Sequence, residues 1–215
     1  MISAEDDDLP VAGTAVILRD GDDGVEVLLL RRPDHGSFAG AWVFPGGALE
    51  PADRIEGAGE VEDACRAAVR ETAEEVDLEL ERLAPLSCWV PPAGVPKRIR
   101  TWFFLAEDPG GEIAAAPGEV AETRWMSPSA ALEAHGRGEI ELWPPTWRTL
   151  HGLLDVRDVE QALTTAGEPP EFRTRRVPTA GGAIFHWDGD ELAGAPAGAR
   201  DRIVAEGLPW RYERS

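Results

Sequence analysis

The chain has 215 residues, of which 43% are hydrophobic and 28% charged; this is the composition of a packed globular protein and excludes a disordered or fibrous chain. Forty acidic residues against 21 basic ones give a formal charge of -19, and a surface of that sign repels the phosphate backbone of nucleic acids. The length fits one sizeable domain with an appendage, and nucleic acid is not expected as a partner.

We expect no signal peptide in the N-terminal segment. Met1–Pro10 is acidic and lacks the basic and apolar regions of a signal peptide, and no apolar run approaches the roughly 18 residues that span a bilayer. We therefore expect a flexible N-terminus over residues 1–10, a cytoplasmic location and no membrane partner. The two cysteines, Cys65 and Cys88, lack the spacing of a zinc site or a disulfide framework, so we expect reduced core thiols.

The next segments predict a hairpin and a short third strand. Residues 13–19 and 25–30 are rich in aliphatic residues, and a turn rich in Asp and Gly separates them. Residues 42–44 form a short strand that runs into the turn Pro45-Gly46-Gly47. A loop rich in Pro, Gly and acidic residues follows as far as Val61.

A helix is predicted over residues 62–76, where apolar residues recur at helical spacing and alanine dominates the inner face. Small inner residues allow this helix to lie close to a sheet. The later predicted elements are strands over 86–90, 99–106 and 123–126, a helix from Ser127-Pro128 to near Gly136, one or two helices over 145–166, and a second hairpin made by 183–187 and 191–192.

These elements predict an α/β fold with one domain over residues 11–166. Residues 167–170 have the composition of a linker, so residues 167–215 are expected to form a small C-terminal extension that packs on the domain or on a partner subunit. The sequence leaves open whether the chain forms a homodimer.

Three glutamates share one face of the predicted central helix. Glu71, Glu74 and Glu75 are related by three and four positions, so their carboxylates converge. Like charges at these spacings repel by roughly 0.2–0.5 kcal/mol per pair, and a bound hard cation reverses that interaction. Carboxylate oxygens are the ligands that Mg²⁺ and Mn²⁺ prefer. For the helix taken alone, an ordinary solvated acidic face is the alternative.

The turn before the helix favours a metal site. The paired glycines of Phe44-Pro45-Gly46-Gly47 can turn sharply and present backbone carbonyls at close approach. Together with Glu62, Arg70-Glu71, Glu74-Glu75 and Leu78, this stretch resembles the Nudix box, a series of Gly, Glu, Arg-Glu and Glu-Glu ending in Gly and an aliphatic residue. The chain is identified on that basis as a member of the Nudix hydrolase family.

The resemblance covers about residues 11–135 and implies the Nudix fold, a mixed β-sheet sandwiched between α-helices. It also implies roles for individual residues. The metal ligands for Mg²⁺ or Mn²⁺ are Gly46 through its carbonyl, Glu71, Glu74 and Glu75. Arg70 orients the catalytic Glu71 through a charge-assisted hydrogen bond, whereas Gly47 and Glu62 are structural members of the motif.

Three features depart from the family pattern. Fourteen residues separate Gly47 from Glu62 where the box normally has five, and such an insert lengthens a surface loop at a small entropic cost. Thr72 stands at an aliphatic position, where we expect its hydroxyl to bond a backbone carbonyl of the preceding turn. Asp77 replaces the helix-ending glycine, and Asp tolerates the positive φ that this position often needs.

A second acidic segment follows the box. Glu119 and Glu122 precede Trp125 in a stretch that resembles the family segment in which a loop glutamate comes before a strand carrying Trp. Either residue is a candidate distal ligand or general base, and Glu119 is favoured because it lies six residues before Trp125. An ordinary acidic loop is the alternative.

The long insert and the segment Trp89 to Phe104 resemble the branch of the family that includes peroxisomal-type coenzyme A diphosphatases. Lys97, the single lysine of the chain, forms a basic cluster with Arg98 and Arg100, and we expect Arg31, Arg98 and Arg100 to bind substrate. An exposed strand edge carrying charge is an equally good interpretation of the cluster.

The expected function is metal-assisted hydrolysis of a diphosphate linkage in a nucleoside diphosphate linked to another group, with coenzyme A as the leading single substrate. The partner is therefore a small-molecule diphosphate. A Nudix-fold binding or sensor module without hydrolysis is the rival hypothesis, and the retention of all three helix glutamates argues against it.

Overall fold

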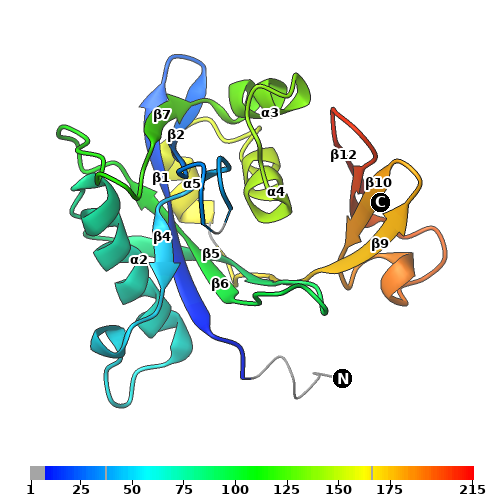
Figure 1. Ribbon diagram of the computed structural model, residues 1–215, viewed down its shortest axis with the longest axis horizontal. Helices are drawn as coiled ribbons and strands as arrows, with labels where there is room; N and C mark the ends of the chain where they lie inside the picture. Colours follow the sequence, from blue (N-terminus) through cyan, green and yellow to red (C-terminus); the bar gives the residue numbers. More distant parts are fainter. Residues whose placement is uncertain (1–7, 37, 166) are drawn as a thin grey trace.

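The protein, in a computed structural model, is described over residues 8–36, 38–165 and 167–215 (Figure 1). The expected flexible stretch over residues 1–10 lies outside the described residues as far as residue 7. The main sheet contains β1 (Val11–Gly21), β2 (Gly24–Arg31), β3 (Trp42–Val43), β4 (Gly46–Ala48), β5 (Leu83–Val90), β6 (Arg100–Glu107), β7 (Glu122–Met126) and β8 (Glu171–Arg173). Its order is β3-β2-β1-β6-β5-β8, with β4 paired to β1 and β7 paired to β2.

The sheet is mixed and is covered on both faces. Strand β1 runs parallel to β6 and antiparallel to β2. Helix α2 (Glu60–Val76) covers one face, and α3 (Pro128–Gly136), α4 (Pro144–Gly152) and α5 (Val159–Thr165) lie over the other (Figure 1). Successive side chains of β1 point to opposite faces of the sheet. Ile17 packs with α2, whereas Leu18 packs with α4 and α5. The predicted α/β fold with a sheet between helices is confirmed.

Helix α2 lies close to β1 because its inner residues are small. Ala64, Ala67 and Ala68 are fully buried, and a Cβ on Gly13 would lie 1.8 Å from the carbonyl oxygen of Ala64. Only glycine fits at that position of the strand. The helix begins at Glu60, two residues before the predicted start, and ends as predicted at Val76.

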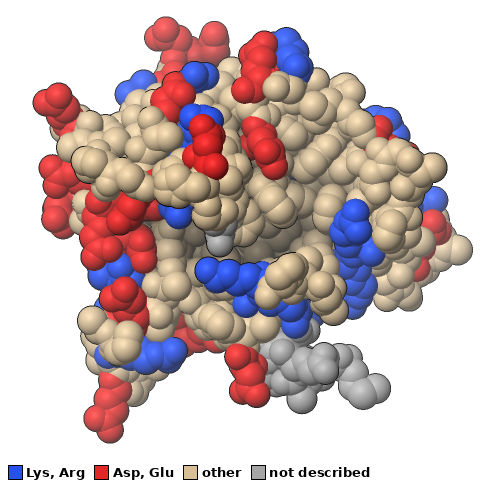
Figure 2. Space-filling view, viewed as in Figure 1, with Lys and Arg blue, Asp and Glu red and all other residues tan. Residues whose placement is uncertain are grey.

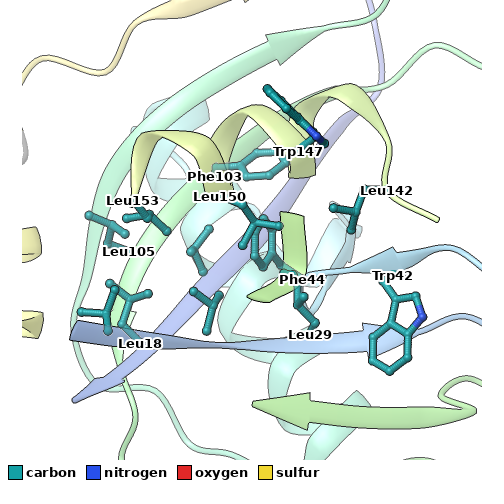
Figure 3. Packing of buried hydrophobic residues seen from close by; sticks show 14 of the residues in the cluster. Leu18, Leu29, Trp42, Phe44, Phe103, Leu105, Leu142, Trp147, Leu150 and Leu153 are labelled. Carbon is teal, nitrogen blue, oxygen red and sulfur yellow. The ribbon is translucent and has the colours of Figure 1, made fainter. Parts of the chain in front are cut away.

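The larger core cluster lies on the opposite face of the sheet. It is built from long side chains such as Leu29, Phe44, Phe103, Trp147 and Leu150 (Figure 3). Burying side chains of this size stabilises the fold by about 1.5–3 kcal/mol each. The cluster packs α3, α4 and α5 against this face of the sheet.

A second sheet follows, with the order β12-β11-β10-β9. Its strands are β9 (Arg175–Thr179), β10 (Gly182–His186), β11 (Asp201–Ala205) and β12 (Arg211–Arg214). Two of its buried residues, Trp187 and Ile203, belong to the same core cluster as the main sheet. Among the described residues, no helix combines the length and apolarity required to cross a membrane.

The predicted hairpin of residues 183–187 with 191–192 is wrong. Strand β10 pairs instead with β9 and β11, and Glu191–Ala193 forms a 3₁₀ turn. The carboxylate of Asp190 accepts a hydrogen bond from the Leu192 N–H and caps this turn. A side chain that satisfies the backbone locally competes with strand pairing.

The two cysteines are free thiols. Cys88 is buried, and burial raises the pKa of its thiol to about 12. Cys65 is half-buried on α2, and burial raises the pKa of its thiol as well. Both thiols therefore remain protonated at neutral pH, which makes them unreactive packing groups.

A buried ion pair organises the second sheet. Both oxygens of Asp190 accept hydrogen bonds from Arg202, at 2.6 and 2.5 Å, and neither residue is more than 7% exposed. Burial disfavours the charged carboxylate, but the hydrogen bonds from Arg202 and from the backbone N–H groups of Asp201 and Leu192 outweigh it and lower the pKa of Asp190 to about 2.

The variant Asp190→Asn is expected to lower the free energy of unfolding by about 3–5 kcal/mol at neutral pH, because it leaves the Arg202 guanidinium buried without its charge partner. The folded-state pKa lies below the unfolded value of about 4, so the stabilisation is present above pH 4 and is lost as the pH falls toward 2. Denaturant titrations between pH 7 and pH 2.5 measure this difference.

Asp188→Asn is the matched control, since Asp188 pairs with Arg175 at the surface. It should change stability by less than about 1 kcal/mol at any pH. Equal pH profiles for the two variants would contradict the role assigned to Asp190.

Candidate active site

Helix α2 is adapted at two positions where its sequence departs from the family pattern. The hydroxyl of buried Thr72 donates a hydrogen bond to the Ala68 carbonyl at 2.8 Å, as predicted. Asp77 ends the helix with φ 59° and ψ 36°, the left-handed conformation that was also predicted. The helix therefore keeps a regular last turn, which carries the glutamates.

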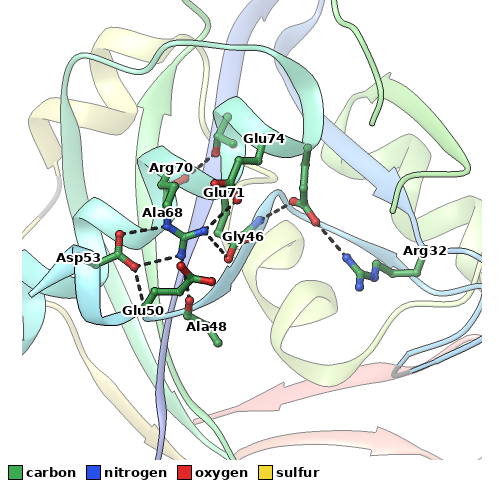
Figure 4. A network of polar contacts seen from close by, with 11 residues as sticks. Arg32, Gly46, Ala48, Glu50, Asp53, Ala68, Arg70, Glu71 and Glu74 are labelled. Atoms are coloured by element: carbon green, nitrogen blue, oxygen red, sulfur yellow. Dashed lines mark hydrogen bonds and ion pairs between the residues drawn. The ribbon is translucent and has the colours of Figure 1, made fainter. Parts of the chain in front are cut away.

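The guanidinium of Arg70 is the centre of a polar network (Figure 4). It donates to both oxygens of Asp53, at 3.1 and 3.0 Å, and to the backbone carbonyl of Ala48 at 3.0 Å. It also donates to Glu71 at 3.0 Å and to Glu74 at 2.9 Å. One cation thus joins two helix carboxylates to the segment that precedes the helix.

The fourteen-residue segment between Gly47 and Glu62, which includes the insert, is packed on α2 over part of its length. Asp53 lies in a short 3₁₀ turn (Pro51–Asp53) and is only 4% exposed. Burial opposes its ionisation, but the hydrogen bonds from Arg70 and from the Glu50 N–H outweigh burial and lower the pKa of Asp53. The carbonyl of Asp53 also accepts a hydrogen bond from Arg66 of the helix. The insert therefore supplies a buried carboxylate as well as loop length.

Glu75 is the most buried of the helix glutamates, with 2% of its surface exposed. Its carboxylate accepts hydrogen bonds from the Gly46 N–H at 2.9 Å and from Arg32 at 3.0 Å. Burial raises its pKa to about 7, and the negative charges of Glu71 and Glu119 contribute in the same direction. A nearby cation would stabilise the charged form of a carboxylate held in this way.

Glu71 lies against the Gly46-Gly47 turn. A Cβ on Gly47 would lie 2.2 to 2.5 Å from the carboxylate atoms of Glu71, so only glycine allows this approach. Burial raises the pKa of Glu71, Arg70 lowers it, and the charges of Glu74 and Glu119 raise it again. The structure therefore brings the glycine turn and the helix glutamates together.

The loop before β7 docks on the end of α2. Its N–H groups at Ala114 and Ala116 bond the carbonyls of Val76 and Glu75, at 3.1 and 2.9 Å. Glu119 is exposed on this loop and its charge acts on both Glu71 and Glu75. Glu122 is turned to Arg124, with a hydrogen bond of 2.6 Å. Of the two candidates, Glu119 is therefore the one placed beside the helix glutamates.

The donor set has the chemistry that a hard divalent cation requires. Several carboxylates of partly buried glutamates lie at one end of α2, on the side of the molecule where acidic side chains gather (Figure 2). Among the described residues, no three acidic, His or Cys side chains are arranged as a ready ligand set. Glu71 and Glu74 share Arg70, and Glu75 holds Arg32 and the Gly46 N–H.

Residues 9–145 match the family profile of the NUDIX domain. The chain belongs to the NUDIX domain family. Members of this family act on small-molecule diphosphates and generally use divalent cations such as Mg²⁺ or Mn²⁺.

Solved structures agree with this assignment. The crystal structure of a NUDIX hydrolase from Alicyclobacillus acidocaldarius is 25% identical, covers 74% of this chain and 98% of that one, and has a TM-score of 0.67. A MutT NUDIX hydrolase from Burkholderia pseudomallei is 26% identical, with 66% and 95% covered and a TM-score of 0.51. The NUDIX domain of Shewanella oneidensis NrtR, solved with ADP ribose, is 16% identical, with 72% and 86% covered and a TM-score of 0.50, and shows the fold alone. By family and by these likenesses, the protein is a pyrophosphohydrolase.

Some residues expected at the Nudix site lie elsewhere. Glu62 is exposed in the first turn of α2, and its carboxylate lies by Gly59, away from Arg70. Arg100 pairs with Glu60 at 3.0 Å, at the helix end opposite to the glutamates. Glu71 is eleven positions after Glu60, which is roughly 16 Å along a helix.

The other two arginines expected to bind substrate are also bonded to groups of the protein. Arg98 donates to the Pro91 carbonyl at 3.0 Å, so it is bonded to the segment that joins β5 to β6. Arg31 bonds Asp34 at 2.5 Å and lines a cavity at the end of β2. Arg32, which directly follows Arg31, holds Glu75 and was not predicted as a site residue.

Asp53, like Arg32, is a site residue that was not predicted from the sequence. Asp53→Asn keeps the size of the side chain but removes the charge that orients Arg70, so it should reduce kcat by about 10- to 100-fold and raise the Mg²⁺ concentration needed for half-maximal activity. Steady-state assays with a magnesium titration measure both effects. The control is Glu56→Gln, an exposed acid of the same insert. If both variants behave alike, Asp53 has no role beyond the charge of the loop.

Proposed function

We propose that the protein hydrolyses a phosphoanhydride bond in a nucleoside diphosphate linked to another group, with Mg²⁺ or Mn²⁺ held by Glu71, Glu74, Glu75 and the Gly46 carbonyl. The observation that supports this best is the crowding of negative charge at one end of α2. The pKa of Glu75 is raised to about 7 and that of Glu71 is raised as well, although each accepts a hydrogen bond from an arginine. A diphosphate can approach carboxylates only if cations lie between them.

The bound metal would neutralise charge on the diphosphate oxygens and lower the pKa of a water molecule. The residues of the chain prepare the site for this. Arg70 fixes Glu71 and Glu74. Arg32 pairs with Glu75 and is proposed to bond a phosphate oxygen of the substrate. Glu119, at the surface and beside these groups, is the proposed acceptor of the proton from water, with a box glutamate as the alternative.

Coenzyme A belongs to the proposed substrate class and is the first compound to test. The long insert favours it, but two of the arginines that suggested it, Arg98 and Arg100, are bonded to Pro91 and Glu60. A panel of coenzyme A, ADP-ribose, NADH, sugar nucleotides and dinucleoside polyphosphates therefore identifies the substrate. Loss of one phosphoanhydride, with release of two phosphorylated products, is the expected result.

Replacing a box glutamate by glutamine keeps its size and removes the ligand charge. Glu74→Gln and Glu75→Gln should each lower turnover by about 10²-fold or more, while the fold is retained. Glu79→Gln, at an exposed acid just beyond the helix, is the control. Wild-type rates in either box variant would refute the metal-ligand assignment.

The choice of general base gives a separate test. Glu119→Gln should lower turnover and abolish the acidic limb of its pH profile, because the proton acceptor is lost. Glu122→Gln should leave both unchanged, since that carboxylate bonds Arg124. The reverse pattern would show that Glu122 is the base.

A further inference from the structure

A cavity of about 610 Å³ lies between the Nudix domain and the second sheet. This volume is in the range that holds small-molecule ligands. One wall contains Arg31 and Trp42, at the ends of β2 and β3, and the opposite wall contains Phe185 of β10 with Leu208 and Trp210 of the β11–β12 connection. The second sheet is therefore part of the cavity and not only an appendage.

The wall from the second sheet is fixed by packing on α3. The ring of Trp210 meets His135 edge-on, with centroids 4.6 Å apart. Pro209 lies against Gly136, where a Cβ would be 3.1 Å from the proline ring. The β11–β12 connection accordingly lies beside α3 in Figure 1. Because both walls are held within one chain, the cavity does not depend on a second subunit.

The cavity presents apolar and aromatic surface beside carboxylates. Trp143 and Leu208 line it and are 44% and 48% exposed, so both side chains offer apolar surface to a ligand. The ring of Phe38 stands edge-on to Trp143, with centroids 5.0 Å apart. Glu139 and Glu141 line the same cavity. Arg137 donates to both oxygens of Glu139, so the Glu141 carboxylate is the acceptor for amino groups of a ligand. A flat base with exocyclic amino groups matches this combination.

Two neighbouring residues at the end of β2 relate the cavity to the helix glutamates. Arg31 lines the cavity, whereas Arg32 holds Glu75 at 3.0 Å. Successive residues of an extended chain point to opposite faces, so the cavity and the glutamates lie on the two sides of the end of β2. A ligand whose diphosphate lies near Arg32 reaches the cavity by extending around this strand end.

We infer that the cavity binds the nucleobase of the substrate, with the aromatic side chains of Trp143 and Trp210 as its apolar walls. The inference rests on the hydrolysis proposed above for the position of the diphosphate. It assigns to the second sheet the function of completing the nucleoside site.

Calorimetric titration with α,β-methylene-ADP and Mg²⁺ tests this, because the bridging carbon prevents hydrolysis. Trp143→Ala and Leu208→Glu should each raise the Kd by about tenfold or more. Leu192→Glu is the control for the second, since Leu192 is 46% exposed in the 3₁₀ turn between β10 and β11 and does not line the cavity. Both cavity residues are nearly half exposed, so the variants should fold, which melting curves verify.

Methylenediphosphonate, which has no nucleoside, serves as the second probe. Its affinity should be the same in the wild type and in both variants. The inference fails if the wild type does not bind α,β-methylene-ADP, if neither variant weakens that binding, or if both probes are weakened equally. It also fails if only coenzyme A binding falls, since the cavity would then hold the pantetheine arm. Cavity-dependent binding without hydrolysis of any compound in the panel would instead refute the proposed function and leave this inference standing.

Discussion

The hydrogen-bonding of one guanidinium connects most of the site. Arg70 holds Glu71 and Glu74 on its own helix, the Ala48 carbonyl at the end of β4, and Asp53 in the insert. Carboxylates that are crowded and partly buried are stable only when paired or hydrogen-bonded. An arginine suits this position because its planar fork offers five donors in fixed directions, whereas lysine offers a point charge.

The same requirement explains the structure of the insert. A loop of fourteen residues costs little more to close than a short one, but its backbone and charges still need partners. Asp53 receives two hydrogen bonds from Arg70, and the Asp53 carbonyl accepts one from Arg66, so the middle of the insert is bonded to α2. This arrangement leaves Glu62, the glutamate that resembles the first of the box, exposed and apart from Arg70.

Features governed by near neighbours could be predicted from the sequence. The hydroxyl of Thr72 bonds four residues back, Asp77 adopts a left-handed conformation at a helix end, and Ser127 caps α3 through the Ala130 N–H. The spacing of apolar residues predicted the individual strands and helices, whereas the sheet between two helical layers was implied by the resemblance to the Nudix family. In each case the partner lies within one helical turn or the pattern repeats along a strand.

Features that depend on distant partners could not be predicted. Asp53 is seventeen positions from Arg70 and Arg32 is forty-three from Glu75, and nothing in the intervening residues indicates these pairs. The pairing of Arg100 with Glu60 and the contribution of the second sheet to the cavity are of the same kind. In the second sheet, Asp190 caps a 3₁₀ turn over residues that were predicted as the second strand of a hairpin.

The central claim is that water attacks a phosphorus atom of a diphosphate at the box glutamates. Hydrolysis of the substrate panel in ¹⁸O-labelled water with Mg²⁺, followed by ³¹P NMR, tests it most directly. The account predicts one ¹⁸O atom in a phosphate group of a single product, and no reaction when the metal is chelated. Label in a non-phosphate position, or no compound of the panel losing its phosphoanhydride, would contradict it.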